Sequence, residues 1–68
     1  MMENLYKDSI FKYKGTGNLY KILSSDCKMK HPITREWIPA VIYQSCDETK
    51  RIWIRDLQEF KEKFELWN

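Results

Sequence analysis

Few residues in this chain could carry out catalytic chemistry. His31 is the only histidine, Glu36 follows it by five positions, and Cys27 and Cys46 are the only thiols. A catalytic interpretation makes His31 a base oriented by Glu36, with one cysteine as the nucleophile. Catalysis also requires oxyanion donors next to the nucleophile, and no glycine-rich turn accompanies either cysteine. We therefore expect that the protein is not an enzyme and that His31 bonds to backbone or solvent in a loop.

Metal and phosphate sites are also disfavoured by the spacing of the residues. The two cysteines are nineteen positions apart and lack the close C-x-x-C pairing of structural zinc sites. The segment G-T-G-N at residues 15–18 has no Lys-Ser/Thr after it and no helix to direct at a phosphate. Because strand-like residues flank this segment, we predict a hairpin turn there, and we expect no cofactor and no metal.

Arg51, Trp53 and Arg55 point to recognition rather than catalysis. In a strand, alternation puts these three side chains on one face and Ile52 and Ile54 on the other. We expect the isoleucines to supply the core face, so that an indole and two guanidinium groups look away from the interior. Three interpretations stay open. Trp53 is buried and the arginines reach outward along it, or the face is a protein or subunit interface, or it binds a planar anion.

The ligand interpretation gives each group on this face a role. Trp53 would stack on a base, and the arginines would pair with phosphate. The partner would then be a nucleotide or one or two bases of single-stranded nucleic acid. Strand order could bring further side chains to the same pocket, and the predicted ligand-binding set is Lys14, Tyr20, His31, Glu36, Tyr43, Trp53 and Arg55.

Hydrophobic alternation predicts the strands that position these residues. The predicted strands are residues 9–14, 18–25, 37–46 and 51–55. Residues 26–36 are predicted to form a polar loop or a poorly regular strand end, and residues 47–50 a turn. Residues 1–8 are predicted to form a short turn of helix or a loose terminus. Two strands joined by the G-T-G-N turn make a hairpin.

The C-terminal segment, residues 56–67, is predicted to be an amphipathic helix. Asp56 and Glu59 fit a capping box at its start. The apolar residues that repeat at spacings of three and four are Leu57, Phe60, Phe64 and Trp67. The fold class is therefore α+β: one domain, residues 1–68, with a small bent antiparallel sheet or half-open SH3-like barrel of about four strands and this helix.

Length and composition restrict the class of protein further. A chain of 68 residues forms one domain with a thin core, so a homo-oligomer that buries additional area stays open. The formal net charge of +2 is too small for a strongly basic nucleic-acid-binding protein. No stretch approaches the ~18 apolar residues of a membrane span, and the first residues contain no apolar run. We expect no membrane partner, reduced thiols and a cytoplasmic location.

Several short segments occur in an order that resembles a known family. They are Y-K-G (13–15), N-L-Y (18–20), H-P-I-T-R-E (31–36), P-A-V-I-Y-Q (39–44) and W-I-R-D-L-Q-E-F (53–60). Together they are similar to the domain-of-unknown-function family 1653, which comprises short, mostly bacterial and phage proteins, and the similarity spans residues 10–64. The chain departs from the family pattern through insertions at Thr16–Gly17 and Trp37–Ile38, Ile33 in place of an acid, and Asp56 in place of a proline.

The resemblance implies a small β-rich domain and no particular reaction. The residues at its pattern positions are Tyr20, His31, Thr34, Glu36, Tyr43, Trp53 and Arg55. We expect a non-catalytic binding module that recognises a nucleotide-like or nucleic-acid anion on the face of Trp53 and Arg55. The alternative is a phage-encoded accessory module that docks on or inhibits a host protein through exposed aromatic side chains.

Overall fold

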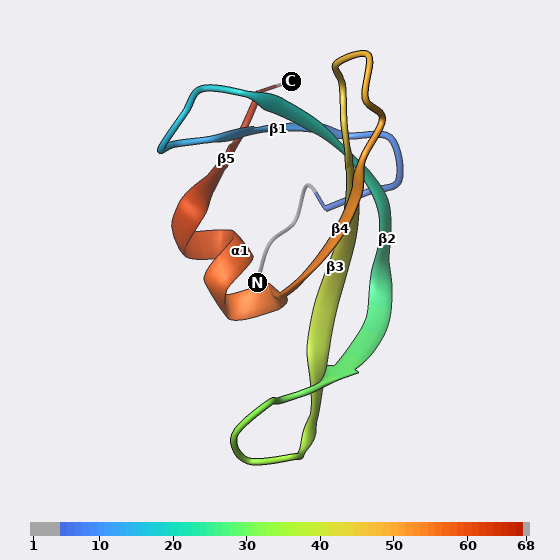
Figure 1. Cartoon of the computed structure of the whole chain (residues 1–68), viewed down its shortest axis with the longest axis vertical. Helices are drawn as coiled ribbons and strands as arrows, with labels where there is room; N and C mark the ends of the chain where they lie inside the picture. Colours follow the sequence, from blue (N-terminus) through green and yellow to red (C-terminus); the bar gives the residue numbers. More distant parts are fainter. Residues whose placement is uncertain (1–4, 68) are drawn as a thin grey trace.

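The computed structural model describes residues 5–67 and contains one antiparallel sheet and one helix (Figure 1). The elements are β1 (Ile10–Tyr13), β2 (Leu19–Lys30), β3 (Trp37–Ser45), β4 (Ile52–Asp56), α1 (Leu57–Lys63) and β5 (Phe64–Leu66). The strand order across the sheet is β4-β3-β2-β1-β5, so β4 and β5 form its edges. The sheet is bent and is not closed into a barrel. The predicted small α+β fold with a bent antiparallel sheet is confirmed, with five strands instead of four.

The G-T-G-N segment forms the predicted turn between β1 and β2. The backbone N–H of Gly17 donates to the carbonyl of Tyr13 at 2.7 Å, and the N–H of Tyr13 donates to the carbonyl of Asn18 at 2.9 Å. Gly17 has a φ of 80°, a left-handed conformation that glycine adopts without a steric penalty. The turn therefore depends on this glycine.

Strand β2 is longer than the predicted residues 18–25. It continues to Lys30, and its last part pairs with β3 from Cys27↔Ala40 to Lys30↔Trp37. This ladder extends past the body of the domain as a two-stranded arm (Figure 1). Of the two alternatives for residues 26–36, the strand end is correct for residues 26–30, where backbone pairing with β3 stabilises a polar segment, and residues 31–36 form the loop.

Helix α1 begins as predicted and ends earlier. The Asp56 carboxylate accepts a hydrogen bond from the backbone N–H of Glu59 at 2.8 Å, so the N-cap is confirmed. Phe60 is the buried residue of the helix. After Lys63 the chain becomes β5, and the expected helix over residues 56–67 is wrong for its last turn.

Strand β5 ends the helix because it completes the hydrogen bonding of β1. The two strands are antiparallel, with Tyr13 opposite Phe64 and Phe11 opposite Leu66. The edge of β1 would otherwise expose a row of unpaired backbone groups. Pairing with β1 thus outweighs the helical spacing of the apolar residues in this segment.

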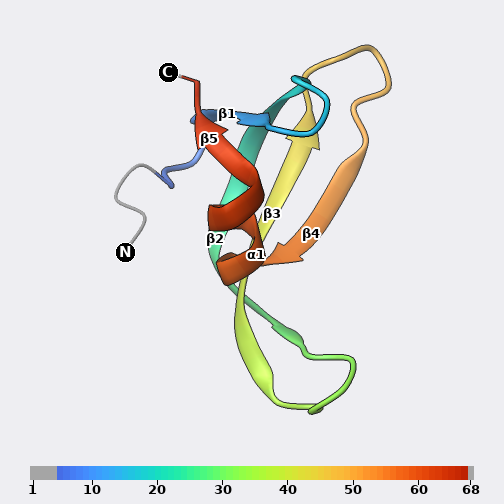
Figure 2. The same ribbon diagram turned by 90° about the vertical axis from the view of Figure 1, so that its left-hand side faces the viewer.

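Helix α1 lies against one face of the bent sheet (Figure 2), and most core residues come from the strands and from this helix. The buried members of the core are Leu5, Phe11, Ile22, Val41, Tyr43, Phe60 and Phe64. Of the predicted N-terminal segment, residues 1–4 lie outside the described residues. Leu5 is in the core, and its carbonyl accepts a hydrogen bond from the Ser25 hydroxyl at 2.6 Å, so this part of the segment is anchored to β2.

Candidate functional site

Strand β4 presents its faces in the opposite sense to the one expected. Trp53 lies opposite Tyr43 and Arg55 opposite Val41, and both β3 residues are core residues. Cross-strand neighbours share a face, so Trp53 and Arg55 lie on the side of the sheet that α1 covers. The expectation that Ile52 and Ile54 supply the core face is wrong, because these side chains lie on the other face and are 61% and 49% exposed.

Trp53 is nevertheless accessible on the face that carries the core. The indole is 45% exposed, so the strand turns it toward the interior without enclosing it. Helix α1 packs against β3 and β4, and its Phe60 ring stacks on Phe64 of β5 at a ring-centroid distance of 4.1 Å. The β4 residues farther from the helix stay open to solvent.

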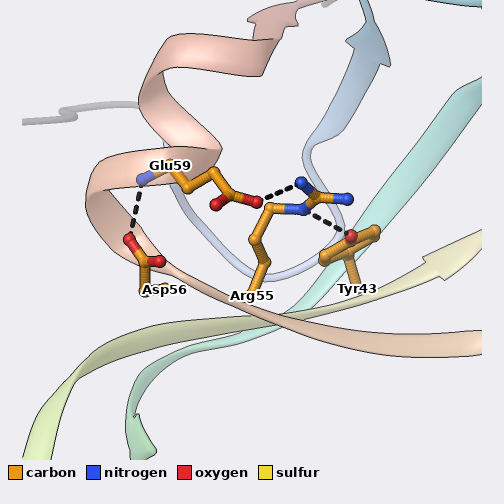
Figure 3. Close-up of polar contacts among 4 residues, drawn as sticks. All are labelled: Tyr43, Arg55, Asp56 and Glu59. Carbon is orange, nitrogen blue, oxygen red and sulfur yellow. Dashed lines mark hydrogen bonds and ion pairs between the residues drawn. The ribbon is translucent and has the colours of Figure 1, made fainter. Parts of the chain in front are cut away.

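Arg55 is held by groups of its own chain (Figure 3). Its Nε donates to the Tyr43 hydroxyl at 3.0 Å, and its Nη1 donates to the Glu59 carboxylate one helical turn away. The guanidinium also lies 5.8 Å from the Tyr13 ring centroid and 5.5 Å from that of Phe64, which are cation–π distances. Burial alone would lower the pKa of Arg55, but the hydrogen bonds to Tyr43 and Glu59 raise it above its ordinary value.

A cleft opens beside this arginine. Its volume is about 160 Å³, and five of its six walls are aromatic; the lining residues are Tyr13, Tyr20, Tyr43, Trp53, Arg55 and Phe64. Edge-to-face contacts join the Tyr20, Tyr43 and Phe64 rings, with the Tyr20 and Tyr43 centroids 5.4 Å apart. The cleft is thus an aromatic pocket at the end of the sheet that carries the G-T-G-N turn.

A second, more polar hollow of about 230 Å³ adjoins the cleft. Its lining residues are Asn18, Tyr20, Ser45, Asp47, Thr49, Arg51 and Trp53. Tyr20 and Trp53 line both hollows, and we call the two neighbouring hollows together the Tyr20–Trp53 groove. Arg51 is exposed, and its guanidinium has no hydrogen bond or ion pair with the described residues.

Asp47 is the acidic group of this groove. Its carboxylate accepts hydrogen bonds from the hydroxyls of Thr49 and Ser45 and from the Thr49 backbone N–H. These bonds, the one from the Thr49 hydroxyl first, hold the pKa of Asp47 below its ordinary value. The carboxylate is therefore ionised at neutral pH and fixes the shape of the turn between β3 and β4.

The structure brings four of the seven predicted site residues together: Tyr20, Tyr43, Trp53 and Arg55 line the groove. Lys14 follows the groove residue Tyr13 in the sequence, but its side chain is directed to the end of α1. There its Nζ donates to the Glu62 carbonyl at 3.2 Å.

His31 and Glu36 lie elsewhere, at the end of the β2–β3 arm. The His31 N–H donates to the Glu36 carbonyl at 2.8 Å, and His31 Nδ1 accepts hydrogen bonds from the N–H groups of Ile33 and Thr34. His31 lines a separate hollow together with the start of α1. Its imidazole therefore organises the loop of the arm.

The thiols do not join His31 in a catalytic arrangement. Cys27 Sγ lies 3.2 Å from the Ala40 carbonyl, and Cys46 is exposed beyond the other end of β3. From Ala40 to Ser45 is five residues along that strand, or roughly 17 Å at about 3.4 Å per residue. Among residues 5–67, no group of three His, Cys, Asp or Glu side chains could hold a metal ion.

Tyr13, Phe64 and Arg51 were not in the predicted set, although they line the groove. Tyr13 has a sequence signal, since it alternates with Phe11 and precedes the turn. Phe64 has none, because its spacing from Phe60 fits a continuous helix. Arg51 was placed on the same strand face as Trp53 and Arg55, but it does not match a pattern position of the resembled family.

Comparison of the chain with family models, with curated proteins and with solved structures found no match. The resemblance to the domain-of-unknown-function family 1653 therefore stays a prediction. The helix within residues 5–67 is too short to cross a membrane.

Proposed function

We propose that this protein is a non-catalytic binding module that holds a planar anionic ligand in the Tyr20–Trp53 groove. The ligand class is a nucleotide-like molecule or a unit of single-stranded nucleic acid. The observation that carries the proposal is the position of an exposed indole in an aromatic cleft next to an unpaired guanidinium, that of Arg51.

The aromatic side of the groove suits a base. Every nucleobase has a π face, and stacking on an aromatic side chain contributes about 1–3 kcal/mol per base. Trp53 and Tyr20 offer such faces from neighbouring positions of β4 and β2, with the buried Tyr43 between them on β3. The Tyr20 ring is already held by edge-to-face contacts with Tyr43 and Phe64, so it loses little freedom on binding, which favours affinity.

The polar side of the groove suits a phosphate. Arg51 can form charge-assisted hydrogen bonds with phosphate oxygens because no described residue occupies its guanidinium. Arg55 has a different role in this proposal. Its Nε and Nη1 already donate to Tyr43 and Glu59, and the Glu59 carboxylate offsets its charge, so we assign it the role of positioning the Tyr43 ring and the α1 helix beside the cleft.

Tryptophan fluorescence tests the proposal. A Trp37→Phe, Trp67→Phe variant leaves Trp53 as the only indole, and its emission is followed during titration with a thymidine oligonucleotide of about eight nucleotides. Stacking should quench the emission. With one or two phosphate contacts, a fourfold rise in salt should weaken binding about threefold to sevenfold, from a slope of about −0.7 per phosphate on single strands.

Arg51→Gln should weaken binding about tenfold, since a charge-assisted hydrogen bond contributes about 1.5 kcal/mol or more. Lys7→Gln is the matched control, because it removes the same charge from an exposed residue that lines neither hollow. Trp53 emission that ignores the oligonucleotide, or equal losses in the two variants, would contradict the proposal.

A second candidate function is docking on a host protein. The observation that favours it is the β2–β3 arm, which extends from the domain and carries exposed Ile33 and Trp37. Binding of a candidate protein that Ile33→Ser abolishes and that Arg51→Gln leaves unchanged would favour this function over the first.

A further inference from the structure

At the outer edge of β4, the backbone N–H and C=O groups of alternate residues point away from the sheet. The backbone N–H of Ser45 donates to the Arg51 carbonyl at 2.9 Å, and the register makes these two residues direct partners. In an antiparallel pair, hydrogen-bonded partners alternate with non-hydrogen-bonded ones. The backbone groups of Trp53 and Arg55 therefore point to β3 as well, while those of Ile52 and Ile54 point away from the sheet.

The central part of this edge lacks several of the features that protect edge strands. Proteins block such edges with proline, bulges, charged side chains or a covering element. The arginines of this segment, Arg51 and Arg55, flank its centre. From Ile52 to Ile54 the strand is apolar, exposed on both faces and paired to β3 without a register shift. Figure 2 shows that β4 lies at the open side of the sheet, away from β1 and β5.

The sequence of the edge reads the same in both directions. Residues 51–55 are Arg-Ile-Trp-Ile-Arg, and this palindrome is flanked by Lys50 on one side and Asp56 on the other. A twofold axis through an antiparallel strand pair places residue i opposite residue j of the partner and residue j opposite i. A palindromic strand presents the same side chains to its partner on both sides of this axis.

Only one register pairs the apolar residues of the two strands with each other. Residues whose backbone groups point away from β3 must lie opposite such residues of the partner strand. This condition leaves three registers close to the centre of the strand. A register centred on Ile52 puts Ile54 opposite the partner's Lys50, which lies outside β4 and has a φ of 52°. A register centred on Ile54 puts Ile52 opposite the partner's Asp56, whose carboxylate caps α1. The register centred on Trp53 places each Ile52 opposite the partner's Ile54 and keeps these pairs within the two strands.

We infer that β4 pairs with β4 of a second copy of this chain in the register centred on Trp53. Ile52 and the partner's Ile54 exchange backbone hydrogen bonds on each side of the axis, and the two sheets become continuous. The register also sets Arg51 opposite the partner's Arg55. The Glu59 carboxylate already neutralises Arg55, so this contact brings together one net positive charge and an ion pair.

The inference needs only the backbone edge and the exposed side chains of β4, and it does not depend on the proposed function. Sedimentation velocity over about 10 μM to about 1 mM tests it, a range suited to a small interface. The mass should rise with concentration from the chain mass of 8.4 kDa toward twice that value.

Ile54→Pro should abolish this rise. The substitution removes an N–H that points to the open edge, and proline is tolerated at such positions of edge strands. Circular dichroism checks that the fold is kept.

Cysteine cross-linking tests the register in a background with Cys27→Ser and Cys46→Ser. Trp53→Cys should form a disulfide-linked dimer, since residues opposite each other in a non-hydrogen-bonded pair have Cα atoms about 4.5 Å apart. Ile52→Cys should not, because its opposite residue is the partner's Ile54. A chain that stays monomeric throughout the range, a dimer that survives Ile54→Pro, or cross-linking through position 52 instead of 53 would overturn the inference.

Discussion

The ion pair between Arg55 and Glu59 should stabilise the domain by more than an ordinary surface pair. Exposed pairs four residues apart contribute about 0.3–0.5 kcal/mol. A charge-assisted hydrogen bond in a shielded site contributes about 1.5–3 kcal/mol. The Arg55 side chain is 26% exposed and Glu59 is 43% exposed, so solvent screens the pair in part. We therefore expect a coupling free energy of about 1 kcal/mol, between these limits.

A double-mutant cycle of Arg55→Met and Glu59→Gln measures this coupling. Urea unfolding of the four proteins gives the free energies, and for so short a chain the slope is about 1 kcal/mol per molar urea. A coupling of about 1 kcal/mol then means that the urea midpoint of the double mutant differs by about 1 M from the value expected if the shifts of the two single mutants were additive.

Lys12 and Glu65 provide the matched control pair. They are cross-strand partners on β1 and β5, with Nζ and Oε1 3.5 Å apart and the side chains 32% and 48% exposed. Their coupling should be about 0.3 kcal/mol and should vanish near 1 M salt, where the screening length is about 3 Å. Equal couplings for the two pairs would refute the view that the aromatic surroundings strengthen the Arg55–Glu59 pair.

Three other changes have expected outcomes. Phe60→Ala should cost about 3–5 kcal/mol, since the ring is fully buried and stacks on Phe64, and thermal unfolding by circular dichroism should show most of the stability lost. Gly17→Ala should cost about 1 kcal/mol through its φ of 80°, while Gly17→Asn should cost less by the same measurement. Asp47 has a pKa lowered by folding, so its contribution is present above the unfolded-state pKa near 4 and is lost as pH falls through the folded-state pKa. Urea titrations between neutral and acidic pH should show this loss, and Asp47→Asn should remove it.

The sequence predicts positions of strands better than the direction of their faces. Alternation in residues 51–55 correctly separates Trp53 and Arg55 from Ile52 and Ile54. Alternation does not say which set faces inward, and hydrophobicity favours the isoleucines. The answer depends on Tyr43, which supplies a hydroxyl acceptor and a ring from another strand, so an arginine becomes the better inward residue.

The end of the helix was unpredictable for a similar reason. The spacing of Phe60 and Phe64 satisfies a helical stripe, and local propensity contains no stop signal before Phe64. The helix stops because the chain pairs with the free edge of β1 and becomes β5, and this pairing depends on the tertiary structure. The position of Phe64 in the groove was unpredictable for the same reason, because it results from the pairing of β5 with β1 and not from a local sequence pattern.

One short strand thus offers two separate surfaces, and the two proposals use different ones. The groove uses side chains on the face that carries the core, and the inferred dimer uses the backbone edge of Ile52 and Ile54. Trp53 belongs to both, because the twofold axis would set its ring beside the partner's Trp53. A base stacked on that ring would compete with the partner ring, and linkage requires the dimer to weaken base binding by the factor by which the base weakens the dimer. Arg51→Gln and Ile54→Pro separate ligand binding from dimer formation. The first leaves the edge N–H groups in place, and the second leaves the Tyr20 and Trp53 rings of the groove unchanged.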